Sequence, residues 1–127
     1  MKLEHPSYNH KFVKDLTLME KPFLKNAIPE LARELETLLQ NESQPELAGQ
    51  VSGLRVIDRC RCGDDFCATF YSVPKPSGAW GSLGQHQNLS LAPERGMIIL
   101  DIVDGRIVCV EVLDRDDVRK NLLEALP

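Results

Sequence analysis

The stretch that most constrains the fold is GMIILDIVDGRIVCVEVLD, residues 96–114. Two runs rich in β-branched residues, 97–103 and 106–113, flank Asp104-Gly105, and an Asp-Gly pair in this setting is a strong signal for a short β-hairpin. Because side chains alternate along a strand, the pairing predicts one face made of Ile98, Leu100, Ile102, Ile107, Cys109, Glu111 and Leu113. The other face takes Met97, Ile99, Asp101, Val103, Arg106, Val108, Val110 and Val112. Both faces are mainly aliphatic, so both need cover from helices, a long loop or a second subunit, and a homodimer through this sheet is one prediction.

The other segments predict a single α+β domain over residues 1–127. Apolar residues at helical spacing predict an N-terminal amphipathic helix within 26–42, and a C-terminal helix is expected after Asp114. We expect an antiparallel sheet of about four strands, at 54–60, 67–73, 97–103 and 106–113. Residues 74–96 are typical of a long connection with room for a short strand near 89–91, and residues 1–25 are a candidate for a loosely ordered arm.

Composition limits the classes of function. The chain has 127 residues, enough for one domain with its own core, and its formal net charge of −4 argues against non-specific nucleic-acid binding. No apolar run approaches the roughly 20 residues of a membrane span, and the N-terminus has no continuous apolar region of the secretion-signal type. The expected location is therefore the cytoplasm, where thiols stay reduced.

Three of the four cysteines lie in RCRCGDDFC, residues 59–67. A hairpin turning within 63–66 would pair Cys62 with Cys67, Cys60 with Thr69, Asp58 with Tyr71 and Val56 with Val73. These eight residues would share one side of the sheet, while Arg55, Ile57, Arg59, Arg61, Ala68, Phe70 and Ser72 would take the other. Because arginines favour water, the cysteine side is predicted to be the inner one, with thiols packed as small apolar side chains.

Two sharper interpretations of these cysteines stay open. Cys60, Cys62 and Cys67 could hold zinc with Cys109 or a histidine as fourth ligand, and Gly63 resembles the glycine that lets amides approach sulfur in zinc knuckles. The spacing, Cys-x-Cys then Cys-x4-Cys, departs from the knuckle pattern. A small cysteine-dependent enzyme would instead use Cys67 with His86 or Asp65. The preferred interpretation assigns no metal, cofactor-binding or catalytic residue.

Five residues are candidates for binding a partner. Trp80 lies in a Gly/Pro-rich segment, where it would either cover the core or anchor a partner, with His86 as a possible companion. Arg55, Arg59 and Arg61 around Phe70 would form a small basic patch on the exposed face of the sheet.

The C-terminal hairpin resembles that of small uncharacterised bacterial domains, which read Gly-x-Ile-Val-x-hydrophobic-Glu-hydrophobic-Leu shortly after an aspartate. Asp101, Gly105, Glu111 and Leu113 match, and the likeness covers about a sixth of the 127-residue chain. The resemblance implies a bacterial source and carries no assigned activity.

The leading functional hypothesis is a non-enzymatic cytoplasmic binding or interaction protein, because no matched nucleophile, base and oxyanion set can be assembled from the sequence. One version is an acidic inhibitor or immunity protein directed at a basic toxin. The alternatives are the zinc-binding module and the cysteine-dependent enzyme described above.

Overall fold

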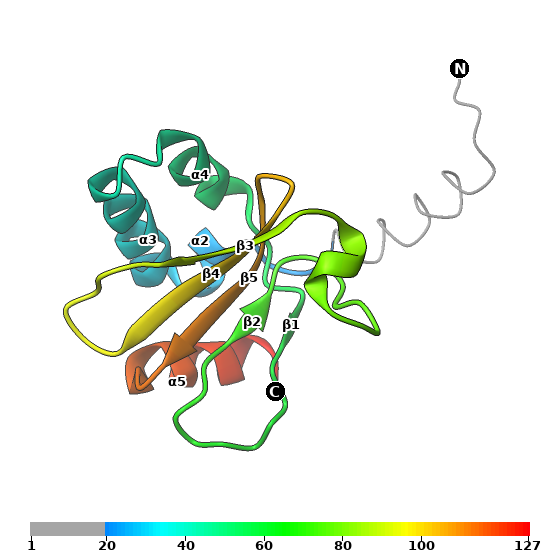
Figure 1. Ribbon diagram of the computed structural model, residues 1–127. Helices are drawn as coiled ribbons and strands as arrows, with labels where there is room; N and C mark the ends of the chain where they lie inside the picture. Colours follow the sequence, from blue (N-terminus) through cyan, green and yellow to red (C-terminus); the bar gives the residue numbers. More distant parts are fainter. Residues whose placement is uncertain (1–19) are drawn as a thin grey trace.

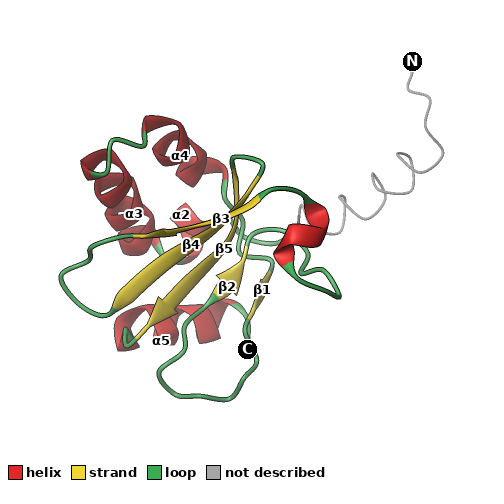
Figure 2. Cartoon of the chain, viewed as in Figure 1, coloured by secondary structure: helices red, strands yellow, loops and turns green. Residues whose placement is uncertain are grey.

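The computed structural model describes residues 20–127 and shows an α+β fold in which helices lie against one side of an antiparallel sheet (Figure 1). The five strands run in the order β1-β2-β5-β4-β3, with bounds β1 Asp58–Arg59, β2 Phe70–Tyr71, β3 His86–Ser90, β4 Met97–Val103 and β5 Arg106–Leu113. The helices are α2 Leu24–Ala27, α3 Pro29–Asn41, α4 Pro45–Gln50 and α5 Asp116–Ala125, with short 3-10 turns η1 Val51–Gly53 and η2 Trp80–Leu83. The predicted fold class is confirmed (Figure 2).

The first two strands are shorter than the predicted 54–60 and 67–73. Residues just before β1 pair instead with the N-terminal segment, since the Val56 amide donates to the Pro22 carbonyl at 2.8 Å and Phe23 bridges to Arg55. The predicted Val56–Val73 pair is therefore wrong: Val56 is fully buried in the main core, whereas Val73 packs on the other side of the sheet. The strand suspected near 89–91 exists as the edge strand β3, which brings the sheet to five strands.

The β4–β5 hairpin turns at Asp104-Gly105 as predicted. Both residues have positive φ, 51° and 80°, as a type I′ turn requires. Gln50 fastens this turn to α4: its side-chain amide donates to the Gly105 carbonyl at 2.7 Å and its oxygen accepts the Ile107 amide at 2.9 Å. The hairpin is thus held in place by the helical layer at its tip.

A β-bulge changes which residues share a face beyond the turn. Asp101 pairs with Cys109 and the next residue, Ile102, pairs with Ile107, so β5 contains one extra residue. The main core consequently takes Val110 and Val112 together with Ile98, Leu100 and Ile102. Cys109, Glu111 and Leu113 lie with Asp101 on the opposite face, where all four line one pocket. The predicted face was correct for β4 but wrong for these residues of β5, because a bulge inverts the alternation.

The main core lies between the sheet and the helices. It contains the helical stripe Ile28, Leu31, Leu35 and Leu39, together with Val118, Leu122 and Leu126 from the C-terminal end of the chain. Each buried leucine-sized side chain contributes about 1.5–3 kcal/mol relative to an exposed one. The predicted amphipathic helix and the predicted C-terminal helix therefore both place their apolar faces on the sheet.

The opposite face, which we call the open face, has only a small apolar cluster among the described residues. Val103, Val108 and Cys109 pack there against Tyr71, Val73 and Trp80. The long connection thus supplies part of the predicted cover through Trp80, while a homodimer through this face stays a prediction. Of the predicted loose arm, Leu24 is fully buried in α2. Residues 1–19 lie outside the described part, and within 20–127 no helix combines the length and apolarity that a membrane span requires.

Candidate metal centre

The cysteine hairpin has the predicted register at two positions, Asp58–Tyr71 and Cys60–Thr69, but the opposite orientation. Asp58 pairs with Tyr71, and the Cys60 amide donates to the Thr69 carbonyl at 2.9 Å. However, the buried side is that of Ala68 and Phe70, both 0% exposed in the main core. Cys60 and Cys67 are only half-buried and Cys62 is exposed, so all three thiols lie on the open face.

The arginines explain why the orientation was predicted wrongly. Arg59 donates from Nε to the Leu126 carbonyl at 2.7 Å, and Arg55 donates to the Lys21 carbonyl at 2.7 Å. The Arg55 guanidinium also lies 3.9 Å from the centre of the Phe23 ring, not beside Phe70. Long arginine stems can cover apolar surface while their heads reach backbone carbonyls or solvent at its rim, so they did not force their side of the sheet outward. Arg61 is exposed and pairs with Asp58 at 3.1 Å.

The sulfur atoms of Cys60, Cys62 and Cys67 all lie within 4.8 Å of one another. All three lie in the connection between β1 and β2, with Cys60 directly after β1 and Cys62 and Cys67 further along it. In a tetrahedral zinc site, where each Zn–S bond is about 2.3 Å, sulfur atoms are roughly 3.8 Å apart. The three thiols therefore need little movement to become three ligands of one zinc ion.

Hydrogen-bond donors already face two of these sulfurs. Gly63 has a φ of +85°, which turns the chain so that the Asp64 backbone bonds to Cys62. The Thr69 backbone and hydroxyl both bond to Cys67. Thr69 is buried and its hydroxyl oxygen accepts the Val112 amide at 3.2 Å, which fixes its position from the central strand. Such donors stabilise thiolates, as metal-bound sulfur requires.

The thiols influence one another's ionisation. The Asp64 backbone lowers the pKa of Cys62, but slight loss of hydration and the neighbouring Cys60 and Cys67 outweigh it and raise that pKa to about 11. For Cys67, burial acts upward, yet the Thr69 bonds and the other two thiols hold its pKa below the ordinary value. Cys67 therefore ionises more readily than Cys62, whereas a divalent cation would favour three thiolates.

Cys109, the predicted fourth ligand, lies elsewhere on the open face. It is opposite Tyr71 on β2 and Asp101 on β4, and it is 2% exposed. Burial, followed by the charges of Asp101 and Glu111, raises the pKa of its thiol well above the usual range. Within residues 20–127 it is not part of the group whose ligand atoms are mutually close.

A carboxyl pair adjoins Cys109. Asp101 is 3% exposed and one of its oxygens, Oδ1, accepts from Asn88 Nδ2 at 2.6 Å and lies 2.8 Å from His86 Nε2. Burial acts to raise the pKa of Asp101, but hydrogen bonds from Glu111, His86 and Asn88 lower it. The hydrogen bond to Asp101, then burial, raises the pKa of Glu111 to about 7, so Glu111 carries the proton that the two share. Sequence reasoning assigned this pair no role, although a charged residue within each aliphatic strand was a visible signal.

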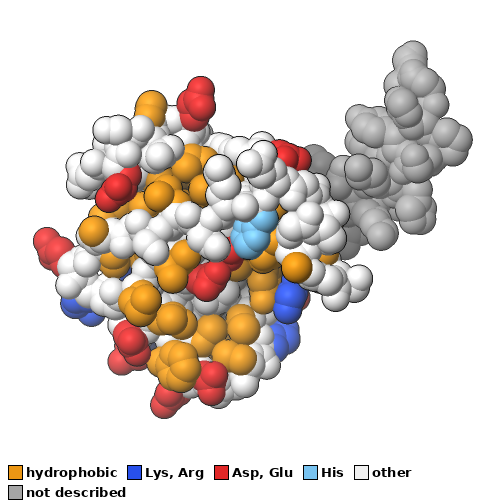
Figure 3. All heavy atoms as spheres, in the orientation of Figure 1, with side chains coloured by type: hydrophobic (Ala, Val, Ile, Leu, Met, Phe, Trp, Pro, Cys, Tyr) orange, Lys and Arg blue, Asp and Glu red, His pale blue; other side chains and the backbone are white. Residues whose placement is uncertain are grey.

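The thiols and the carboxyl pair line the same shallow pocket of about 320 Å³. Its walls include Tyr71 and Trp80, whose ring centroids are 6.2 Å apart, and Lys75, whose ammonium lies 5.7 Å from the Tyr71 ring. Figure 3 shows the open face, where acidic side chains and a histidine border a group of hydrophobic ones. Trp80 is half-buried, between the two roles considered for it.

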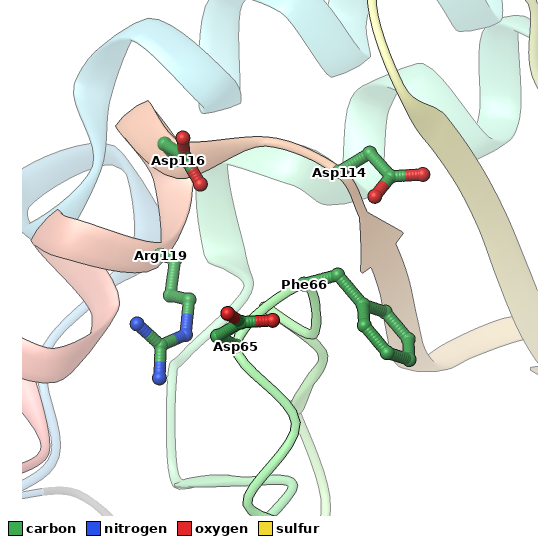
Figure 4. A pocket seen from close by; sticks show the side chains of 5 residues that line it. All are labelled: Asp65, Phe66, Asp114, Asp116 and Arg119. Atoms are coloured by element: carbon green, nitrogen blue, oxygen red, sulfur yellow. The ribbon is translucent and has the colours of Figure 1, made fainter.

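The partners considered for a catalytic Cys67 lie in other places. His86 is opposite Val103 at one end of β4, whereas Cys67 bridges to Leu113 at the other end of the hairpin. Asp65 lines a separate pocket of about 510 Å³ with Phe66, Asp114, Asp116 and Arg119 (Figure 4). The structure thus brings Cys60, Cys62 and Cys67 together and places neither proposed base in an interaction with them.

Comparison of the chain with models of protein families, with curated proteins and with solved structures finds no match in any of the three. The bacterial source implied by the C-terminal hairpin stays a prediction.

Proposed function

We propose that this protein is a zinc-binding module in which Cys60, Cys62 and Cys67 supply three thiolate ligands. The observation that carries the proposal is the mutual approach of the three sulfurs to within 4.8 Å on a face that solvent reaches. The bonds from Asp64 and Thr69 to two of the sulfurs support it, because they pre-organise the site for anionic sulfur. Packed thiols, the interpretation preferred from the sequence because the arginines were expected to face water, fit less well with an exposed Cys62.

The role we propose for the metal is to order the hairpin loop. β1 and β2 have only two residues each, and between the Cys60–Thr69 hydrogen bond and the Cys67–Leu113 bridge strand pairing gives residues 61–65 little support. A zinc ion would connect both sides of that loop and fix Phe66, which is 47% exposed. In this proposal the ordered loop presents Phe66 to a protein partner in the cytoplasm, and the module is non-enzymatic. In one version of this proposal the partner is a basic toxin that the protein inhibits.

The test is metal content. Protein purified under reducing conditions without chelator should contain about one zinc per chain, measured by plasma mass spectrometry. The variant C60S/C62S/C67S should contain none, whereas the matched control Cys109→Ser should keep its zinc. Wild-type protein that stays zinc-free after incubation with excess zinc, or a triple variant that binds as much as wild type, would refute the proposal.

A second candidate is a cysteine nucleophile, favoured by the bonds from Thr69 that lower the pKa of Cys67. It predicts that iodoacetamide labels Cys67 of the folded, metal-free protein much faster than Cys109, which is buried. Peptide mapping after brief labelling checks this. Equally slow labelling of all four thiols would eliminate a nucleophilic role.

A further inference from the structure

We infer that the zinc ion has an exchangeable fourth position facing the pocket on the open face, and that this position binds the sulfhydryl of a small amino-acid thiol. The inference rests on the proposed zinc site and adds a class of ligand to it. Among residues 20–127, no other cysteine, histidine, aspartate or glutamate joins the mutually close group of Cys60, Cys62 and Cys67. Zinc sites with three protein ligands usually keep their fourth position for water or substrate.

The pocket gives the fourth ligand a place to lie. All three cysteines line it, so the space next to their sulfurs is the pocket itself and not protein interior. Its volume of about 320 Å³ is at the small end of the range of ligand pockets, which begins at about 300 Å³. Cys109 also lines the pocket, but its sulfur is not among the three that lie within 4.8 Å of one another, so it leaves the position open.

The walls of the pocket favour a particular chemistry. Three thiolates make the zinc site soft, and sulfur is the donor that such a site accepts most readily. Tyr71 and Trp80 offer aromatic surface to a methylene group. Lys75, beside the Tyr71 ring, offers a positive charge for a carboxylate, and the Asp101–Glu111 pair offers a negative charge for an ammonium group. A molecule with a thiol, a carboxylate and an amine on a short chain matches all of these; free cysteine is the simplest.

The exchange is a simple substitution. The Zn–O bond to water breaks, a Zn–S bond to the ligand forms, and the thiol proton passes to solvent, with no change in oxidation state. Three thiolates leave zinc with one net negative charge, so the added thiolate increases the negative charge. The ammonium group of Lys75 lowers the total negative charge of the complex. We therefore pair it with the carboxylate of the bound ligand.

Cobalt provides the test because its spectrum reports on sulfur ligands. We would load the full-length protein with Co²⁺ and titrate it with L-cysteine, 2-mercaptoethanol and L-alanine. We expect L-cysteine to raise the sulfur-to-cobalt charge-transfer absorption by about one third, as three thiolates become four, with saturation. L-Alanine should have no effect. The variant Lys75→Met should weaken L-cysteine binding roughly fivefold, as loss of one charged contact implies, and leave 2-mercaptoethanol binding unchanged.

The outcomes separate the two proposals. If no cobalt binds, the zinc module itself fails. If cobalt binds with three-thiolate intensity but no thiol changes the spectrum, the zinc module stands and the exchangeable position is refuted. Four-thiolate intensity that Cys109→Ser reduces would show a site closed by Cys109 and would also refute it. Thiol binding that appears only in the H5A/H10A variant, whose altered residues lie outside the described range, would refute it too, because a histidine would then fill the fourth position.

Discussion

The two faces of the sheet differ although the same strands build both. The face under the helices contains large apolar side chains that are fully buried, such as Phe70, Leu100 and Val110. The open face contains the thiols, the Asp101–Glu111 pair and half-buried aromatic rings. Since strand neighbours point to opposite sides, Phe70 and Tyr71 belong to different environments despite being adjacent. One face thus supplies most of the fold's stability, which leaves the other free to carry reactive groups.

The largest expected effect tests that division at two adjacent positions. Phe70→Ala removes a ring that is 0% exposed and should lower the free energy of unfolding by about 3–5 kcal/mol. Tyr71→Ala removes a half-buried ring from the open face and should cost about 1–2 kcal/mol. Urea denaturation of the two variants measures both values. Equal losses would show that the open face contributes as much to folding as the helix-covered one.

The sequence predicts the two faces of the sheet only where the alternation of side chains along a strand can be followed. Asp104-Gly105 is a pair that favours the positive φ angles of a tight turn, so the hairpin was predicted correctly. Residues 107–110 are all apolar and all buried, and such a run contains no sign of which residue is the extra one in the bulge. The faces of Cys109 and Glu111 therefore could not be predicted from the sequence.

The candidate site was predictable in its members but not in its surroundings. Cys60, Cys62 and Cys67 stand out by their spacing, and the turn between them predicts the Asp58–Tyr71 and Cys60–Thr69 pairs correctly. Their orientation was predicted wrongly. It was inferred from arginines that were expected to face water but that bond to carbonyls such as that of Leu126. Thr69, which supports Cys67, gives no signal in the sequence because its role depends on the Val112 amide of a distant strand.

A loss of stability of intermediate size is expected when the paired charge of Arg115, on the helix-covered side, loses a partner. Arg115 is 6% exposed and donates to both oxygens of Glu34 on α3, at 2.8 and 2.9 Å. Glu34→Gln leaves that guanidinium with Asp117 as its remaining carboxylate partner and should lower the free energy of unfolding by about 1–3 kcal/mol. Thermal denaturation at low and high salt checks the loss, which salt should barely alter.

The matched control is Arg95→Gln, which breaks a pair with Asp117 at 3.3 Å whose side chains are 67% and 40% exposed. Exposed pairs contribute about 0–1 kcal/mol, so this change should cost less than the Glu34 change. A control that destabilises the protein as much as Glu34→Gln would mean that burial does not set the value of these ion pairs.

The smallest effect sharpens the comparison on the open face, where the Asp101 and Glu111 carboxyl groups share a proton. The hydrogen bond to Asp101, then burial, raises the pKa of Glu111 from 4.5 to about 7. A carboxyl group with a raised pKa binds its proton more tightly in the folded chain, so its contribution to stability is complete below about pH 4.5 and is lost as pH rises through about 7.

Glu111→Gln keeps a donor towards Asp101 but cannot ionise. We therefore expect wild type to lose stability relative to this variant between pH 5 and pH 8, measured by urea denaturation at each pH with Asp101 and His86 unchanged. Any pH dependence from the metal site is common to both proteins and cancels in the difference. A difference that is constant over this range would show that Glu111 is already ionised at pH 5, and that solvent, not Asp101, determines its charge on this face.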